Sequence, residues 1–140
     1  MKTKFDSVVK LKKQNVDKIQ NDIQKINKAI LELSEKTEEL RSSLLRLTIP
    51  KSGLFSKITQ INTQKSFIRN EIKNLQNQIQ ILASRKKELF NELKSAKIEY
   101  EKMKYLQGEE IKKKLKELKL KESREMDEIA ILLRNQNESR

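Results

Sequence analysis

An apolar heptad repeat between residues 16 and 47 limits this chain to one kind of fold. Its members recur at alternating spacings of three and four residues, with Thr37 as the one polar position: Val16, Ile19, Ile23, Ile26, Ile30, Leu33, Leu40, Leu44 and Leu47. A repeat of about 3.5 residues keeps a narrow apolar stripe on one side of a helix, which must then pack along a second helix. A helix of a compact domain would carry a wider apolar face. The repeat therefore predicts a coiled coil.

The first helix is predicted to span about residues 4–48. Thr3 and Asp6 have the spacing of a capping box, in which the threonine hydroxyl accepts a hydrogen bond from a free amide and the aspartate reaches back. Extending the repeat backwards places Phe5, Val9 and Lys12 on the same stripe. The stem of Lys12 can lie along an apolar stripe while its ammonium group reaches water.

A turn is predicted at residues 49–53. Pro50 disfavours helical geometry at the residue before it, and Gly53 accepts backbone conformations that other residues avoid. Because helices joined by so short a connection usually run antiparallel, the second helix should return along the first. We expect it to span about residues 54–134.

The second helix carries a matching seam, in which Lys65 and Lys86 are the charged positions. Its members are Phe55, Ile58, Ile61, Lys65, Ile68, Ile72, Leu75, Ile79, Leu82, Lys86, Leu89, Leu93, Ala96, Tyr100 and Met103. A turn near Lys51 predicts a register in which Ile23 faces Ile79 and Thr37 faces Lys65. In this register the polar Thr37 of the first seam meets the charged Lys65 of the second, and such a polar pair can fix the alignment of a coiled coil. The predicted fold is all-α, an antiparallel two-helix coiled-coil hairpin in one domain, residues 1–140, with a long C-terminal helical extension.

In the predicted register the first helix ends opposite about residue 98, so the rest of the second helix has no partner within the chain. Gly108 marks either a soft point or an end of that helix. Beyond it, an apolar stripe consists of Ile111, Leu115, Leu118, Met126, Ile129 and Leu133. Exposed stripes of this size usually mark an interface, although folding back at Gly108 or self-association would also cover it.

The composition argues against an enzyme. The chain is 35% hydrophobic and 37% charged, and it has neither cysteine nor histidine, which excludes disulfides, thiolate chemistry and imidazole ligands. We find no phosphate-binding glycine loop, nucleophile elbow or metal-ligand cluster. The longest apolar run, residues 129–133, is far too short to cross a membrane. No catalytic residue, cofactor or metal is expected.

The formal charge of +12 allows several partners. A basic surface attracts acidic proteins, nucleic acids or anionic lipids, but a lysine-rich composition can also arise from mutational bias alone. Between residues 112 and 121 there are six lysines and one glutamate. This run is either a solvated helical face, a contact with an acidic protein surface, or a contact with a phosphate backbone. Aromatic residues are only 4% of the chain, and none lies in the run to stack on bases.

Three segments resemble the FliJ family of the bacterial flagellar export apparatus. Residues 5–13, Phe-Asp-Ser-Val-Val-Lys-Leu-Lys-Lys, resemble its N-terminal pattern. Residues 100–104, Tyr-Glu-Lys-Met-Lys, and residues 122–130, Glu-Ser-Arg-Glu-Met-Asp-Glu-Ile-Ala, resemble its C-terminal signature. The match in sequence is confined to the two ends, whereas the expected size, basicity and architecture agree along the whole chain.

The resemblance implies a non-catalytic stalk and adaptor in flagellar protein export, located in the cytoplasm at the cytoplasmic face of the inner membrane. Family members place their terminal ends in the pore of the export ATPase hexamer, face the export gate protein with the hairpin tip, and escort substrate chaperones. Carried onto this chain, the tip comprises Leu47, Ile49, Leu54 and Phe55, which could also simply close the turn. The residues expected to meet the ATPase ring are Lys10, Lys13, Lys102, Lys104, Lys112, Lys113, Lys116, Lys119 and Arg124.

Three alternatives remain open from the sequence. The chain could be a basic coiled coil associated with nucleic acid, for which a steep salt dependence of binding would be diagnostic. It could be a structural coiled coil that self-assembles through the stripe at residues 111–133. It could also be the equivalent stalk of a non-flagellar type III secretion system.

Overall fold

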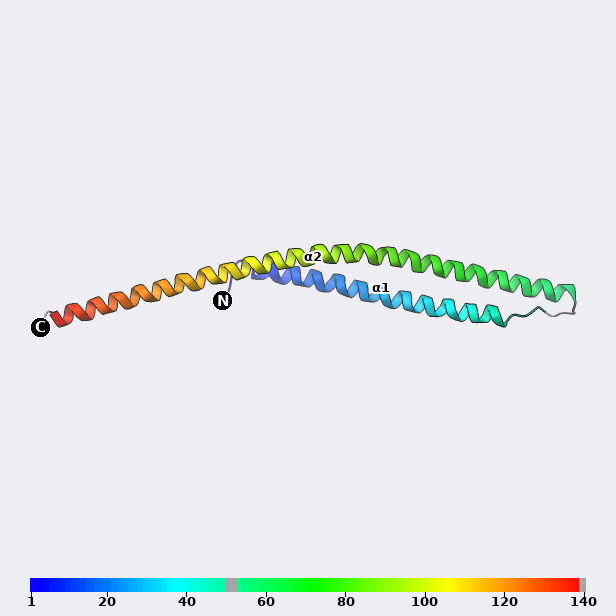
Figure 1. Ribbon diagram of the computed structural model, residues 1–140, viewed down its shortest axis with the longest axis horizontal. Helices are drawn as coiled ribbons and strands as arrows, with labels where there is room; N and C mark the ends of the chain where they lie inside the picture. Colours follow the sequence, from blue (N-terminus) through cyan, green and yellow to red (C-terminus); the bar gives the residue numbers. More distant parts are fainter. Residues whose placement is uncertain (50–52, 139–140) are drawn as a thin grey trace. The chain divides into compact units, whose positions relative to one another are not determined.

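A computed structural model describes residues 1–49 and 53–138 of the chain. These residues form two helices and no strand: α1 spans Asp6–Arg46 and α2 spans Phe55–Glu138 (Figure 1). The predicted all-α class is therefore confirmed. Pro50, which was expected to break the helix, lies outside the described residues.

The structure divides into two compact units. The hairpin unit comprises Asp17–Ser95, and the terminal unit comprises Met1–Val16 together with α2 from Ala96 onward. In each unit a stretch of α1 lies beside a stretch of α2 and runs in the opposite direction (Figure 1). The antiparallel helical pairing that the seams predict is thus present in both units.

A line of apolar side chains forms the core of the hairpin unit. Ile19, Ile23, Leu89 and Leu93 are buried, with Leu89 only 2% exposed. The other predicted aliphatic seam residues of this unit are half-buried: Ile26, Ile30, Leu33, Leu40, Leu44, Ile58, Ile61, Ile68, Ile72, Leu75, Ile79 and Leu82. These residues are only half-buried because two helices alone cannot enclose a side chain that no third element covers.

The predicted register of the two helices is wrong. Ser43 and Leu47 of α1 line one pocket with Gln64, Phe67 and Ile68 of α2. In antiparallel helices, each step back along α1 from Leu47 corresponds to about one step forward along α2 from Gln64. Among the seam residues of α2, this alignment therefore puts Leu89 opposite Ile23, whereas the predicted register put Ile79 there. Seam residues recur every three or four positions, so two seams can pair at several registers, and their spacing does not choose among them.

The pairing of Thr37 with Lys65 is also wrong, since the observed alignment puts Thr37 opposite Leu75. Thr37 is buried, at 4% exposure, and its hydroxyl donates to the Leu33 carbonyl oxygen at 2.8 Å. A threonine that bonds to the preceding turn of its own helix needs no polar partner across the interface. Its polarity therefore carries no information about the register.

The start of α1 has the predicted capping box. The Thr3 N–H donates to Asp6 Oδ2 at 3.1 Å, and the Phe5 N–H donates to the Thr3 hydroxyl oxygen at 3.2 Å. Both bonds satisfy amides that precede the regular hydrogen bonding of the helix. The regular helix begins at Asp6, two residues after the predicted start.

Gly108 does not end the second helix, because α2 continues through it to Glu138. A Cβ atom added at Gly108 would meet nothing within 4 Å. Glycine costs about 0.5 to 1 kcal/mol relative to alanine inside a helix, which the hydrogen bonding of the flanking turns can absorb.

Candidate protein interface

Polar contacts hold the N-terminus of the chain against α2 within the terminal unit. The Gln107 amide nitrogen donates to Asp6 Oδ1 at 2.9 Å, and the Lys114 ammonium donates to the Lys2 carbonyl oxygen at 2.7 Å. Lys12 and Glu99 form an ion pair at 3.9 Å. The first helix therefore begins opposite Gln107, and the residues before it extend to Lys114, so the expectation that the first helix ends opposite residue 98 is wrong.

The apolar part of the terminal unit is small. Val16 and Ala96 are buried at 4% and 6% exposure, and the polar contacts of Asp6 and Lys2 follow toward the chain's start. Gln107 was not among the residues predicted from the sequence, although it stands four residues after the seam residue Met103 and so continues the seam with a polar side chain.

Asp6 is the group with the clearest electrostatic signature in this unit. The Thr3 hydroxyl donates to Asp6 Oδ1 at 2.6 Å, and this bond is the largest cause that lowers the pKa of the Asp6 carboxyl from 3.8 to about 2. The Gln107 amide and the Thr3 N–H contribute next. All three donors favour the ionised carboxylate. The contribution of these bonds to stability is therefore complete above about pH 4 and is lost as the pH falls toward 2.

We expect an NMR titration of the Asp6 carboxyl carbon to give a midpoint near pH 2 in the wild-type chain. Thr3→Ala should raise this midpoint more than Gln107→Leu does, because the threonine hydroxyl is the principal donor. A wild-type midpoint at the ordinary aspartate value would contradict the described cap. Equal midpoints in the wild type and Thr3→Ala would show that the hydroxyl is not its cause.

The basic residues predicted to meet a partner are all exposed, and the structure brings some of them together. Lys13 and Lys104 hold their ammonium groups 5.8 Å and 5.7 Å from the centre of the Tyr100 ring, within the range of cation–π attraction. Lys102 lies 3.9 Å from Glu99, and Lys112 lies 3.6 Å from Glu109. Such exposed pairs are weak and a partner can replace them.

The C-terminal extension, residues 115–138, is helical and exposed along its whole length. Among the residues that the structure describes, Lys116, Lys119 and Arg124 have no ion-pair partner. The predicted apolar residues of the extension are between 44% and 71% exposed: Leu115, Leu118, Met126, Ile129 and Leu133. The extension thus presents both apolar area and unpaired positive charge.

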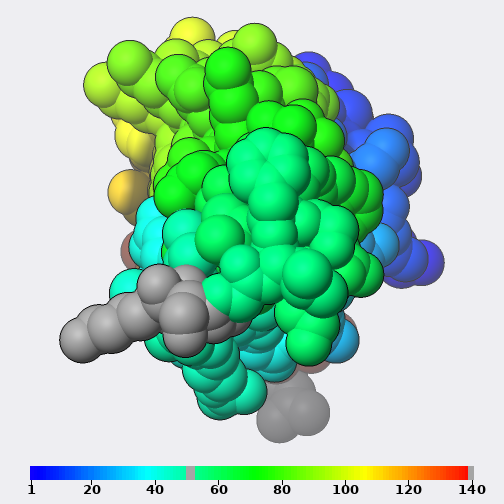
Figure 2. All heavy atoms as spheres, turned by 90° about the vertical axis from the view of Figure 1, so that its right-hand side faces the viewer, coloured from blue at the N-terminus to red at the C-terminus, as the bar shows by residue number. Residues whose placement is uncertain are grey.

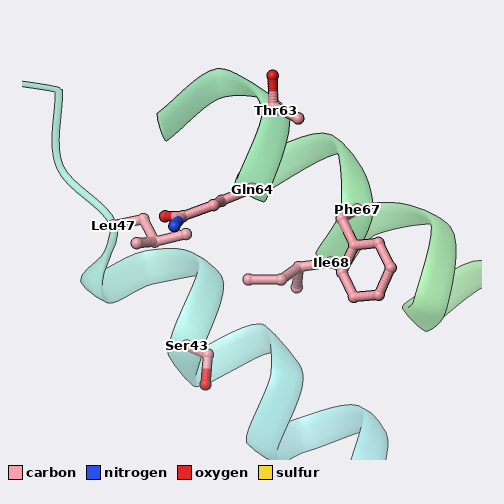
Figure 3. A pocket seen from close by; sticks show the side chains of 6 residues that line it. All are labelled: Ser43, Leu47, Thr63, Gln64, Phe67 and Ile68. Atoms are coloured by element: carbon pink, nitrogen blue, oxygen red, sulfur yellow. The ribbon is translucent and has the colours of Figure 1, made fainter. Parts of the chain in front are cut away.

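A second candidate surface lies in the hairpin unit, near the end of α1. Ser43, Leu47, Thr63, Gln64, Phe67 and Ile68 line a pocket of about 460 Å³ (Figure 3). Ile68 points toward α1, Gln64 extends toward Leu47, and the Thr63 hydroxyl points away from α1 (Figure 3). Phe67 is 65% exposed. Phe67 was not among the residues predicted from the sequence, although an exposed aromatic residue beside the seam is a sign of a contact surface.

The predicted tip residues lie at the same end of the hairpin unit. Leu54 and Phe55 are 70% and 83% exposed, Ile49 is exposed, and Leu47 lines the pocket. Figure 2 looks onto this end, with the first residues of α2 in blue-green toward the viewer. Leu54 and Phe55 therefore do not close the turn as a buried apolar cap.

Comparison with known proteins identifies the family. The family model described as flagellar FliJ protein matches residues 1–139. The chain belongs to the FliJ family. No curated protein and no solved structure matches it. FliJ proteins are non-catalytic components related to flagellar export, so membership implies an export-related role with protein partners. Within the described part of the chain, neither helix of this FliJ-family protein is apolar enough over a sufficient length to cross a membrane.

Proposed function

We propose that this chain is the stalk and adaptor of a flagellar export machine. In this proposal the terminal unit binds the ring of the export ATPase, and the tip of the hairpin unit faces the export gate protein. The chain also escorts substrate chaperones and acts at the cytoplasmic face of the inner membrane. The observation that carries the proposal is the C-terminal extension, a helix in which all of residues 115–138 are exposed.

The extension suits insertion into a ring of acidic protein surface. A single helix is about 10 to 12 Å across with its side chains, which is narrow enough for a central pore. The lysines between residues 112 and 121, which precede and begin the extension, supply attraction to carboxylates, while the exposed leucines of the extension supply apolar area. A solvated face with no partner would not need the apolar residues.

The pocket beside Leu47 and Phe67 supports a second contact at the tip. Exposed aromatic and aliphatic side chains around a concave apolar site are the usual anchors of a protein interface. A chain bound to the ring by its terminal unit would leave this site available to the gate.

The proposed mechanism is one of interaction alone. A chain without rotational symmetry in the pore of a symmetric ring makes different contacts with each subunit. Those contacts favour different nucleotide states in different subunits, since a ligand shifts an equilibrium only through its differential affinity for the two states. The hairpin unit then transmits that difference to the gate.

The proposal is tested by purifying the chain from a lysate of its own cells with nuclease added, and identifying the bound proteins by mass spectrometry. We expect the export ATPase and the gate protein to be recovered, because contacts between proteins survive nuclease. Recovery of nucleic-acid-binding proteins that disappear with nuclease, or of neither export component, would contradict the proposal.

A further inference from the structure

An apolar stripe runs along the C-terminal extension and begins one turn before it, at the half-buried Ile111. Its positions are Ile111, Leu115, Leu118, Glu122, Met126, Ile129 and Leu133, and the successive spacings are four, three, four, four, three and four. This order reads the same in both directions from Glu122. We propose that the extension binds the same segment of a second copy of this chain, antiparallel, with the two-fold axis at Glu122.

These positions share one face of α2. At about 100° per residue they all lie within about 40° of one line along the helix. Among the apolar members, Leu118 is 46% exposed and Ile129 is 56% exposed, and α1 covers neither. Leu120, which is 51% exposed, lies on the opposite side of the helix. The stripe is therefore a defined surface, distinct from the back of the helix.

A second copy fits this surface because the symmetry pairs apolar residues with apolar residues. Around Glu122, Leu118 lies opposite Met126 of the second copy, and Leu115 lies opposite Ile129. A two-fold pair makes each contact twice, so these two pairings give four apolar contacts. The pairing of Ile111 with Leu133 adds two more.

The charges beside the stripe favour the antiparallel direction. Lys121 and Glu125 lie on the same flank, and antiparallel helices bring equal flanks together. Lys121 of one copy therefore meets Glu125 of the other, and neither residue has an ion-pair partner within the described part of its own chain. A parallel pair would bring opposite flanks together and place Lys121 near Lys119.

Glu122 sets the strength of the association. The two-fold axis brings the Glu122 carboxylates of both copies together within an apolar seam, where like charges repel each other. The pair is thus expected to be weak and reversible. One consequence rests on the proposed function: a self-paired extension covers the face that would enter the ATPase ring, so the two interactions exclude each other.

The first test is the mass of the purified chain by sedimentation over a concentration series from low to high micromolar. We expect the mass to rise from 16.6 kDa toward twice that value. Leu118→Asp should weaken the association by at least about tenfold, whereas Leu120→Asp, the matched control on the opposite face, should not. Glu122→Leu should strengthen it by about tenfold or more. A constant monomer mass for both the wild type and Glu122→Leu would overturn the proposal.

The second test determines whether the two paired extensions run antiparallel or parallel, by disulfide formation. Because the chain has no native cysteine, only the introduced cysteines can form disulfides. Leu115→Cys and Ile129→Cys are each introduced into a chain that also carries Glu122→Leu, and one of the two variants carries a mass tag. The two variants are mixed and oxidised. Antiparallel pairing predicts disulfides mainly between the two variants, while disulfides mainly within each variant would overturn it. Lys121→Glu and Glu125→Lys should each weaken the dimer, and the double exchange should restore it. None of these measurements contains the ATPase, so their failure and that of the proposed function are separate results.

Discussion

Leu89→Ala is expected to lower the free energy of unfolding of this chain by about 2 to 5 kcal/mol, the range for a leucine removed from a packed core. Leu89 is the most buried core residue, at 2% exposure, and the alignment derived from the pocket at Leu47 places it opposite Ile23. Truncation removes apolar contact area and leaves a cavity that neighbouring side chains can only partly fill. Because two paired helices have few buried residues, the loss is a large part of the total stability.

The effect is measured by urea unfolding followed by the helical circular dichroism signal. Leu31→Ala is the matched control, since Leu31 belongs to the same unit and is 60% exposed. We expect this control to change the free energy of unfolding by less than about 0.5 kcal/mol. Comparable losses in both variants would contradict the described core and the register that places Leu89 in it.

The second large effect is expected in binding. Reversal of four exposed lysines of the terminal unit to glutamate should weaken binding to the export ATPase by about a hundredfold or more, since like charges at an interface cost several kcal/mol. The changed residues are Lys112, Lys113, Lys116 and Lys119. Helical content should not change, because these side chains cover no core and only Lys112 makes a weak exposed pair, with Glu109.

A control with the same change in net charge separates local contact from general attraction. Four exposed lysines of α1 in the hairpin unit serve this purpose: Lys18, Lys25, Lys28 and Lys36. Their reversal should affect binding several-fold at low salt and little at physiological salt, where the Debye length is about 8 Å. If both sets of reversals weaken binding equally, the terminal lysines are not a specific site.

The sequence predicts the helices of this protein well because their causes are local. A heptad repeat demands a helical partner whatever the rest of the chain does, and Thr3 with Asp6 caps α1 through residues three positions apart. The register depends instead on which of several seam alignments buries the most apolar area. That choice depends on which residues far apart in the sequence come together, such as Leu47 and Ile68, which line the same pocket.

The candidate surfaces also combine features that the sequence predicts with features that depend on the register. The exposure of the C-terminal stripe was expected from a helix that outruns its partner, but where it begins depends on the register and on the contact of Lys2 with Lys114. The pocket beside Phe67 could not be expected, because it arises only where the end of α1 meets a particular turn of α2. The assignment of the basic residues to an ATPase ring comes from the family resemblance and stays a prediction.

The most direct test of the stalk proposal is the stoichiometry of the complex between this chain and the purified export ATPase. The ATPase is assembled as a hexamer with a non-hydrolysable nucleotide and titrated with the chain, and the mass of the complex is read by native mass spectrometry. An asymmetric stalk in a central pore predicts one chain per hexamer, with no further binding at excess chain. Six chains per hexamer would indicate a site on each subunit, and that result, like the absence of binding, would contradict the account.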